Sequence, residues 1–212
     1  MLMNNLVWLG HATFRVDKDI IVYFDPFQID EGKKADLILV SHKHSDHCSK
    51  QDILKILKKD TVIVTEKDSA EILGMDNVIV LEPNQSVEVK GVKIKAVRAY
   101  NVDKPFHPKE NDWLGYVVDF GDLTIYHAGD TDIIEEMKDI QCDIALVPLF
   151  PGDKYVMNPV DSGKSTFYFK SKYVVPMHYG TIGGDESDAQ IMKENANPKS
   201  VVKVLKQVKN TF

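Results

Sequence analysis

Four side chains that commonly bind metals crowd into six residues, directly after a short apolar run. The run Leu37-Ile38-Leu39-Val40 is typical of a strand buried on both faces, and Ser41 separates it from the segment His42-Lys43-His44-Ser45-Asp46-His47. In extended backbone His42, His44 and Asp46 start out on one face. A turn into a following helix would bring His47 round to them. Imidazole and carboxylate are ordinary zinc ligands, so the segment predicts a metal site, with a solvated histidine-rich loop as the alternative.

The composition fits an ordinary globular protein. The chain has 212 residues, of which 43% are hydrophobic, and we expect one domain spanning residues 1–212. A net charge of −6 disfavours a general nucleic-acid-binding surface, although a local basic strip stays open. Cys48 and Cys142 are too few for a disulfide scaffold and are expected to be reduced thiols. We see neither a signal peptide nor an apolar run long enough to cross a membrane, so a cytoplasmic location is the default expectation.

The predicted elements are mostly short strands. We expect strands at 6–9, 13–16, 20–24, 37–40, 61–65, 78–81, 87–89, 92–97, 116–120, 123–127, 144–147, 173–177 and 201–204. Helices are expected at 50–59, 132–138, 159–170 and 189–195, the first with Ser49 as its N-cap and Asp52 completing a capping box. Each half of the chain contains strand-rich hairpins and a helix that follows a buried strand. This pattern favours a layered α/β protein.

Five motifs, taken in order, resemble the metallo-β-lactamase superfamily. The His-x-His-x-Asp-His element after a buried strand is its hallmark. The other four motifs are Trp8-Leu9-Gly10-His11-Ala12-Thr13-Phe14, Asp25-Pro26-Phe27, Tyr126-His127-Ala128-Gly129-Asp130-Thr131 and Pro176-Met177-His178-Tyr179-Gly180-Thr181. The branch looks like that of the ascorbate-phosphate lactonases. The resemblance covers nearly the whole chain and implies a four-layer αββα sandwich.

The resemblance also implies roles for individual residues. His42 and His44 would bind a first metal ion, and Asp46, His47 and His178 a second, with Asp130 bridging both. Asp25 would orient the histidine segment. Two Zn²⁺ ions are expected, with Mn²⁺, Fe²⁺ or Ni²⁺ as alternatives. Asp46 and Asp130 are the carboxylates expected to take part in catalysis through the metals.

One departure from the family pattern concerns the first metal. Relatives usually place a third histidine at the end of the strand before the 101–113 loop, but here that strand ends Arg98-Ala99-Tyr100-Asn101. His107 could fold back from the loop as the missing ligand, or it could be a surface histidine. His127 is expected to be a packed, hydrogen-bonded residue. For His11, a role beside the metal pocket and a purely structural role stay equally open.

The expected activity is hydrolysis by a metal-bound hydroxide, which suits ester, lactone and phosphodiester bonds. Lys104, Lys109 and Trp113 in the 101–113 loop would suit a small anionic substrate if they lie beside the metal pocket, and a solvated loop is the equally open alternative. A nuclease acting on nucleic acid and a non-catalytic iron-binding or redox protein are the alternatives. The acidic net charge argues against the former. The histidine at position 44, where diiron relatives carry a carboxylate, argues against the latter. A homo-oligomer stays open.

Overall fold

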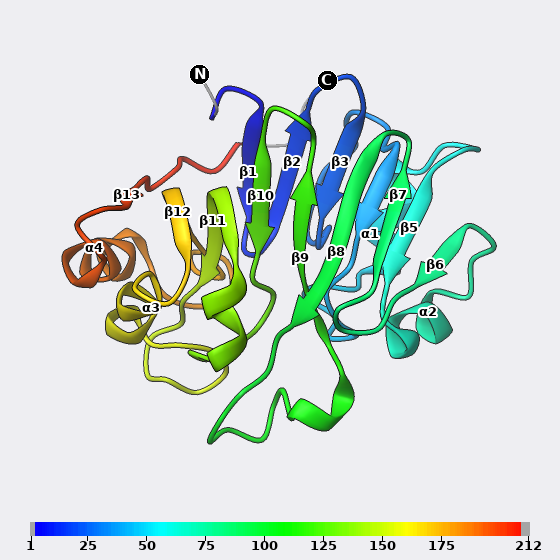
Figure 1. Ribbon diagram of the computed structural model, residues 1–212. Helices are drawn as coiled ribbons and strands as arrows, with labels where there is room; N and C mark the ends of the chain where they lie inside the picture. The colour runs from blue at the N-terminus through cyan, green and yellow to red at the C-terminus, as the bar shows by residue number, and fades with distance from the viewer. Residues whose placement is uncertain (1–2, 209–212) are drawn as a thin grey trace.

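Two β-sheets lie face to face in a computed structural model that describes residues 3–208 (Figure 1). The first sheet comes from the N-terminal part of the chain and has the strand order β1-β2-β3-β4-β5-β6. Its strands are β1 (Leu6–Gly10), β2 (Thr13–Asp17), β3 (Ile21–Phe24), β4 (Leu37–Leu39), β5 (Val62–Thr65) and β6 (Val78–Val80). The first three strands form an antiparallel meander, and the last four run parallel.

The second sheet has the strand order β13-β12-β11-β10-β9-β8-β7. Its strands are β7 (Ser86–Val89), β8 (Val92–Arg98), β9 (Leu114–Asp119), β10 (Thr124–His127), β11 (Gln141–Pro148), β12 (Lys170–Met177) and β13 (Val201–Val202). Each sheet therefore combines antiparallel hairpins with parallel strands.

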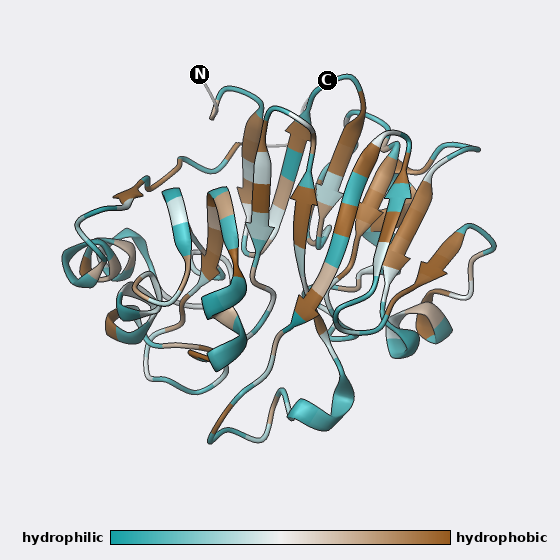
Figure 2. Cartoon of the chain, viewed as in Figure 1, coloured by the Kyte–Doolittle hydropathy of each residue, from teal (hydrophilic) through white to brown (hydrophobic). Residues whose placement is uncertain are grey.

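The alternation of side chains along the strands builds two hydrophobic layers. In β4, Leu37 and Leu39 belong to the large cluster between the sheets, while Ile38 belongs to a second cluster on the opposite face. Ile53 and Ile56 of α1 (Lys50–Ile56) pack into this second cluster. The strands are accordingly mostly hydrophobic, whereas the outer surfaces of the helices are largely polar (Figure 2). Burial on both faces explains why β4 reads as an unbroken apolar run.

Helices cover the outer faces of both sheets, which confirms the predicted αββα sandwich. Helix α1 and α2 (Lys67–Leu73) lie on the first sheet, and α3 (Pro159–Ser165) and α4 (Glu186–Asn195) on the second (Figure 1). Ala189 and Met192 anchor α4 in the main cluster. Among residues 3–208 no helix is both long enough and apolar enough to cross a membrane.

Several helix predictions were wrong in extent or type. Helix α2 was not predicted, because the residue at its N-cap is Glu66, an unusual choice, and because its sequence has little apolar periodicity. Residues 159–170 were predicted as one helix, but α3 ends at Ser165 and Lys170 already belongs to β12. Residues 132–138 were predicted as a helix but hold only a 3₁₀ turn at Glu135–Asp139. The helix predicted at 50–59 ends at Ile56.

The Asp52 side chain at the start of α1 has a different role from the predicted one, which was to complete a capping box with Ser49. Ser49 is the N-cap, as predicted, and accepts a hydrogen bond from the Asp52 amide. The Asp52 carboxylate, however, accepts hydrogen bonds from the amides of Gln28 and Ile29. It therefore ties the loop after β3 to the helix that follows the histidine segment.

The loops that carry the predicted site residues meet at one end of the two sheets. Backbone hydrogen bonds join them across the sandwich, from the Leu114 amide to the Ser41 carbonyl and from the His178 amide to the His11 carbonyl, each at 3.0 Å. The turn between β1 and β2 and the end of β10 lie at this same end (Figure 1). The fold thus gathers residues that are up to about 170 positions apart in the chain.

Candidate metal centre

Asp25 holds the histidine segment in place through hydrogen bonds to Ser41 and His47. Its carboxylate accepts hydrogen bonds from the Ser41 amide and the Ser41 hydroxyl, both at 2.7 Å. It also lies 2.7 Å from Nδ1 of His47. Ser41 Oγ in turn lies 2.9 Å from Nδ1 of His42. These contacts fix the orientation of both rings, and they direct Nε2 of His42 toward His44, 3.0 Å from its Nδ1, and Nε2 of His47 toward Asp130.

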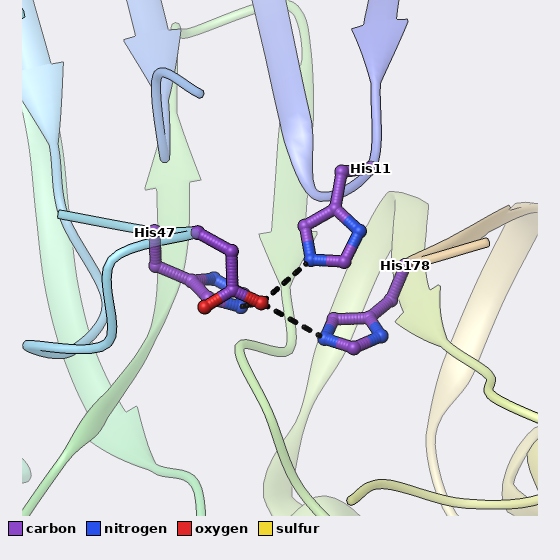
Figure 3. Close-up of side chains that lie close together, drawn as sticks. His11, His47 and His178 are labelled. Atoms are coloured by element: carbon purple, nitrogen blue, oxygen red, sulfur yellow. Dashed lines mark hydrogen bonds and ion pairs between the residues drawn. The ribbon is translucent and has the colours of Figure 1, made fainter. Parts of the chain in front are cut away.

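His11 sits in the tight turn between β1 and β2 and faces the same cavity. Its carbonyl accepts hydrogen bonds from the Trp8 indole and the His178 amide, which fixes the turn. Nε2 of His11 lies 3.0 Å from Asp46 Oδ2. The rings of His11, His47 and His178 converge on one point (Figure 3). His11 therefore touches a predicted metal ligand, and the glycine-histidine pair of the opening motif was the signal for it.

His107 folds back from the loop into the site. Its Nδ1 lies 2.9 Å from Asn101 Oδ1 and 3.2 Å from the Tyr155 carbonyl. Nε2 is thereby directed toward Asp130, 3.2 Å from its Oδ2. The ring is 1% exposed, so it is not a surface histidine. Asn101 is a positioning residue that the sequence did not single out.

Asp130 lies at the centre of the cluster. Its Oδ2 is 3.1 Å from Nε2 of His178, 3.3 Å from Nε2 of His47 and 3.9 Å from Nε2 of His42. Gly129 precedes it with a φ of +63°, and a Cβ there would lie 2.5 Å from the Leu114 carbonyl oxygen. Glycine is thus required because the chain passes so close to the Leu114 backbone.

The candidate ligand atoms form groups in which all members lie within 4.8 Å of one another. We call His42, His44 and His107 the first group, and His11, Asp46, His47 and His178 the second group. A further set joins Asp130 with His42 and His47, one residue from each group. All seven residues predicted from the sequence are therefore brought together, and His11 joins them.

The charges in this cluster depend on burial and on its neighbours. Burial, reinforced by His107, lowers the pKa of His44 to about 4, and burial with His178 lowers that of His11 to about 4. Burial alone would raise the pKa of Asp130, but His178 and His47 together hold it well below its usual range. Burial alone would lower the pKa of His47, but three carboxylates outweigh that effect and raise it. His47 therefore carries the balancing proton, which a bound cation would displace.

The unsatisfied atoms of the cluster fit a metal centre. Within residues 3–208, the buried Nε2 atoms of His47, His107 and His178 have no hydrogen bond of good geometry, although Asp130 Oδ2 lies close to each. Asp130 Oδ1 is likewise buried without a partner. Buried polar groups are nearly always satisfied, and leaving one unpaired costs about 1–3 kcal/mol. Divalent cations would satisfy these lone pairs together.

A cavity of about 360 Å³ opens onto this cluster. Its lining includes four of the candidate ligands, namely His44, Asp46, His107 and His178, together with Asp130. The rest of the wall is Phe27, Ser45, Phe106, Phe150, Tyr155 and Ile182. The metal cluster thus forms the floor of a small pocket with mostly apolar walls.

The loop cations do not line this cavity, contrary to what the sequence suggested. Lys104 forms ion pairs with Asp132 and Asp153, and Lys109 pairs with Glu136. Trp113 is buried behind the site, with its ring centroid 4.9 Å from that of His42. The two lysines and the tryptophan therefore support the loop and the histidines.

His127 and the two cysteines have structural positions. His127 Nε2 lies 3.0 Å from the Ala12 carbonyl, and its ring stacks on Phe24 with centroids 5.2 Å apart. This agrees with the packed role expected for it. Cys48 and Cys142 are both buried and free, as predicted. Cys48 packs in the hydrophobic cluster beneath α1, on the side of the first sheet away from the cavity.

Comparison with known proteins gives the family. Residues 5–178 match the profile of the β-lactamase superfamily domain. A UPF0173 metal-dependent hydrolase from Methanopyrus kandleri is 32% identical over 207 residues, covering 89% of each chain. A UPF0173 metal-dependent hydrolase from Thermoplasma acidophilum is also 32% identical, over 221 residues and 97% of each chain.

Solved structures agree with these relatives. A protein from Parabacteroides distasonis superposes with a TM-score of 0.82 at 29% identity, covering 96% of this chain and 93% of that one. Igni18, a metallo hydrolase from Ignicoccus hospitalis, superposes with a TM-score of 0.77 at 22% identity, which shows the shared fold. The chain therefore belongs to the metallo-β-lactamase superfamily, as its motifs predicted, and is a metal-dependent hydrolase.

Proposed function

We propose that the protein is a two-metal hydrolase that cleaves an ester, lactone or phosphodiester bond in a small molecule. The observation that carries the proposal is the position of Asp130, whose Oδ2 lies 3.1–3.3 Å from three buried imidazole nitrogens that have no hydrogen bond of good geometry within residues 3–208. These three nitrogens come from both groups. A carboxylate in this position can belong to two metal sites at once.

We assign one ion to each group. The first group offers three imidazoles, and the second offers three imidazoles and the Asp46 carboxylate. Nitrogen and oxygen donors suit Zn²⁺ first, and Mn²⁺, Fe²⁺ or Ni²⁺ as alternatives. Asp130 would bridge the pair, and His11 would be a fourth donor of the second group.

Two such ions would supply an activated water and polarise the substrate oxygen. The residues of this chain prepare the site for that chemistry. Asp25 and Ser41 hold the rings of His42 and His47, and Asn101 holds that of His107. The apolar walls of the cavity limit the number of water molecules around its floor, and a substrate that filled it would displace them and strengthen the electrostatic interactions there.

The test combines metal analysis with a substrate panel. Protein purified without chelator should contain close to two equivalents of metal per chain by elemental analysis. It should hydrolyse at least one compound among simple esters, lactones and bis-p-nitrophenyl phosphate, and chelation should abolish the activity. A protein that neither contains nor takes up any of the four metals would contradict the proposal.

The panel also separates the alternative functions. Activity on bis-p-nitrophenyl phosphate and on oligonucleotides, but not on esters or lactones, would indicate the nuclease instead. Full metal content without any hydrolysis would indicate a metal-binding protein that is not an enzyme. The structure disfavours the nuclease because no lysine or arginine is among the described residues that line the cavity.

A further inference from the structure

The walls of the cavity above the metal cluster are aromatic. Phe27, Phe106, Phe150, Tyr155 and Ile182 surround the floor formed by the candidate ligands. The cavity volume of about 360 Å³ is at the small end of the range of roughly 300–1,000 Å³ for ligand pockets. The space therefore suits a compact group, and the wall suits an apolar one.

These aromatic side chains hold one another in place. The ring centroids of Phe150 and Tyr155 are 5.1 Å apart, and those of Phe106 and Tyr155 are 4.7 Å apart, both edge to face. Phe150 also lies against Gly183, where a Cβ would come within 2.8 Å of its ring. Edge-to-face packing of this kind is favourable beyond simple burial. The wall is thus a formed surface before any ligand enters.

A charged group on the substrate would find no oppositely charged partner at this wall. Among the described residues that line the cavity, the ionisable side chains are the candidate ligands at its floor and the phenol of Tyr155, and no lysine or arginine is among them. The nearby cation Lys154 is exposed and lies over the ring of Tyr155, 4.8 Å from its centroid, but is not among the lining residues. Burying an ion without a partner is far more costly than burying an apolar group.

We propose that the substrate presents an uncharged aromatic or branched apolar group to this wall, next to the bond that is cleaved. The inference rests on the proposed hydrolase and replaces the small anionic substrate suggested by Lys104 and Lys109. The metal centre would bind the polar, reacting end of the molecule. The wall of Phe106, Phe150 and Tyr155 would select the other end by shape and lack of charge.

The test compares two esters of similar shape and reactivity. Methyl p-toluate carries a methyl group where monomethyl terephthalate carries a carboxylate, and neither ester has an aromatic leaving group that could occupy the wall instead. With the metal-loaded protein, kcat/KM should be at least tenfold higher for the toluate after correction for hydroxide-catalysed hydrolysis. Equal rates, or a preference for the terephthalate, would overturn the proposal.

Substitutions in the aromatic wall test whether the wall causes this preference for the uncharged ester. Phe150→Ala should lower kcat/KM for the toluate at least tenfold but that for methyl acetate less than threefold, with metal content unchanged. Phe106→Ala, at a more exposed position, should act in the same direction if Phe150→Ala does not fold. Phe167→Ala is the control, because Phe167 is 58% exposed and lies outside the cavity lining. An equal loss on both esters would contradict a role in selectivity.

A binding measurement separates this inference from the proposed reaction. Calorimetry with p-methylbenzyl alcohol should show binding to the metal-loaded wild type and to Phe167→Ala, at least fivefold weaker in Phe150→Ala. If no ester is cleaved but this pattern is found, the pocket assignment stands and the hydrolase proposal fails. No binding, or equal binding in all three proteins, would overturn the pocket assignment itself.

Discussion

The first and second groups of candidate ligands are held by different parts of the molecule. The second group is fixed by strand ends and tight turns, since the His178 amide donates to the His11 carbonyl and Asp25 accepts from His47. The first group depends on the loop between β8 and β9, which brings in His107 through Asn101. His42 of the first group shares the Ser41–Asp25 support of the second group. The two groups thus differ in one ligand, since only the first takes a histidine from the loop between β8 and β9.

This difference links the first group to the substrate pocket. Phe106, which lines the cavity, immediately precedes His107 in the same loop. A change in the loop would therefore alter both a candidate metal ligand and the aromatic wall. In the second group the corresponding wall residue, Ile182, follows His178 by four positions and is not aromatic, so we expect the two sites to respond differently to mutation.

The largest effect is expected where the two groups meet, at Asp130. Asp130→Asn keeps the size of the side chain but removes the charge that would offset the repulsion between the two proposed cations. We expect kcat/KM to fall at least about a hundredfold, a typical effect of removing a key electrostatic group, with little loss of folding. Steady-state kinetics, elemental analysis and circular dichroism measure the three quantities.

The control for this variant is Asp122→Asn, at an exposed carboxylate that pairs with Lys18 far from the site. It should leave activity and metal content unchanged. A folded Asp130→Asn protein that kept full activity and both metals would show that the bridging role is misplaced, and Asp46 would become the next candidate.

Removing one histidine from each group should affect the groups unequally. His107→Ala leaves the first group with only His42 and His44, and we expect its ion to be lost. His178→Ala leaves His11, Asp46 and His47 in the second group, so its ion should be weakened more than about a hundredfold but still be detectable at high metal concentration. Metal titration by calorimetry on both variants makes the comparison. Unchanged stoichiometry in both would contradict the assignment of these residues as ligands.

A smaller effect is expected from the residue that orients His107. Asn101→Ala removes the Oδ1 atom 2.9 Å from Nδ1 of His107 but leaves the ring itself. Partners of this kind typically change metal affinity by about 10–100-fold. We expect that loss for one ion only, measured by competition with a chelating dye. Equal weakening of both ions would mean that the loop supports the whole site and not the first group alone.

The sequence predicted the parts of the site that depend on local pattern. The unbroken apolar run of β4 followed by His42 to His47 identified both the strand and the candidate ligands. His107 could be named only as a possibility, because whether a loop folds back depends on contacts such as Asn101 and Tyr155 that no local pattern reveals. His11 was left open for the same reason.

The misjudged features also depend on tertiary contacts. For Lys104 and Lys109 a place beside the pocket and a place in a solvated loop were both open, and Asp132, Asp153 and Glu136 from elsewhere in the fold form ion pairs with them. Phe150 and Ile182 line the cavity although nothing in their own segments marks them. Helix α2 was missed because its capping glutamate carries no strong start signal. Charge pairing and cavity walls are formed by distant segments, so a single sequence does not reveal them.

The smallest effect is expected from changes at the two cysteines. Cys48 follows His47 directly in the sequence and Cys142 lies in the core, but neither has a role in the proposed chemistry. Burial raises the pKa of the Cys48 thiol to about 11 and that of Cys142 to about 12. At pH 8 Cys48 should therefore hold on the order of a hundredfold less thiolate than an exposed cysteine, and Cys142 on the order of a thousandfold less, and access is blocked as well. The native protein should not react with a disulfide reagent such as dithionitrobenzoate within an hour, whereas two thiols should react after denaturation.

Cys48→Ala should keep metal content and activity within about twofold, since the nucleophile in our proposal comes from water and not from a thiol. Rapid labelling of the native protein, or a large loss of activity in Cys48→Ala without loss of metal, would show that Cys48 acts together with His47 on the cavity side of the sheet.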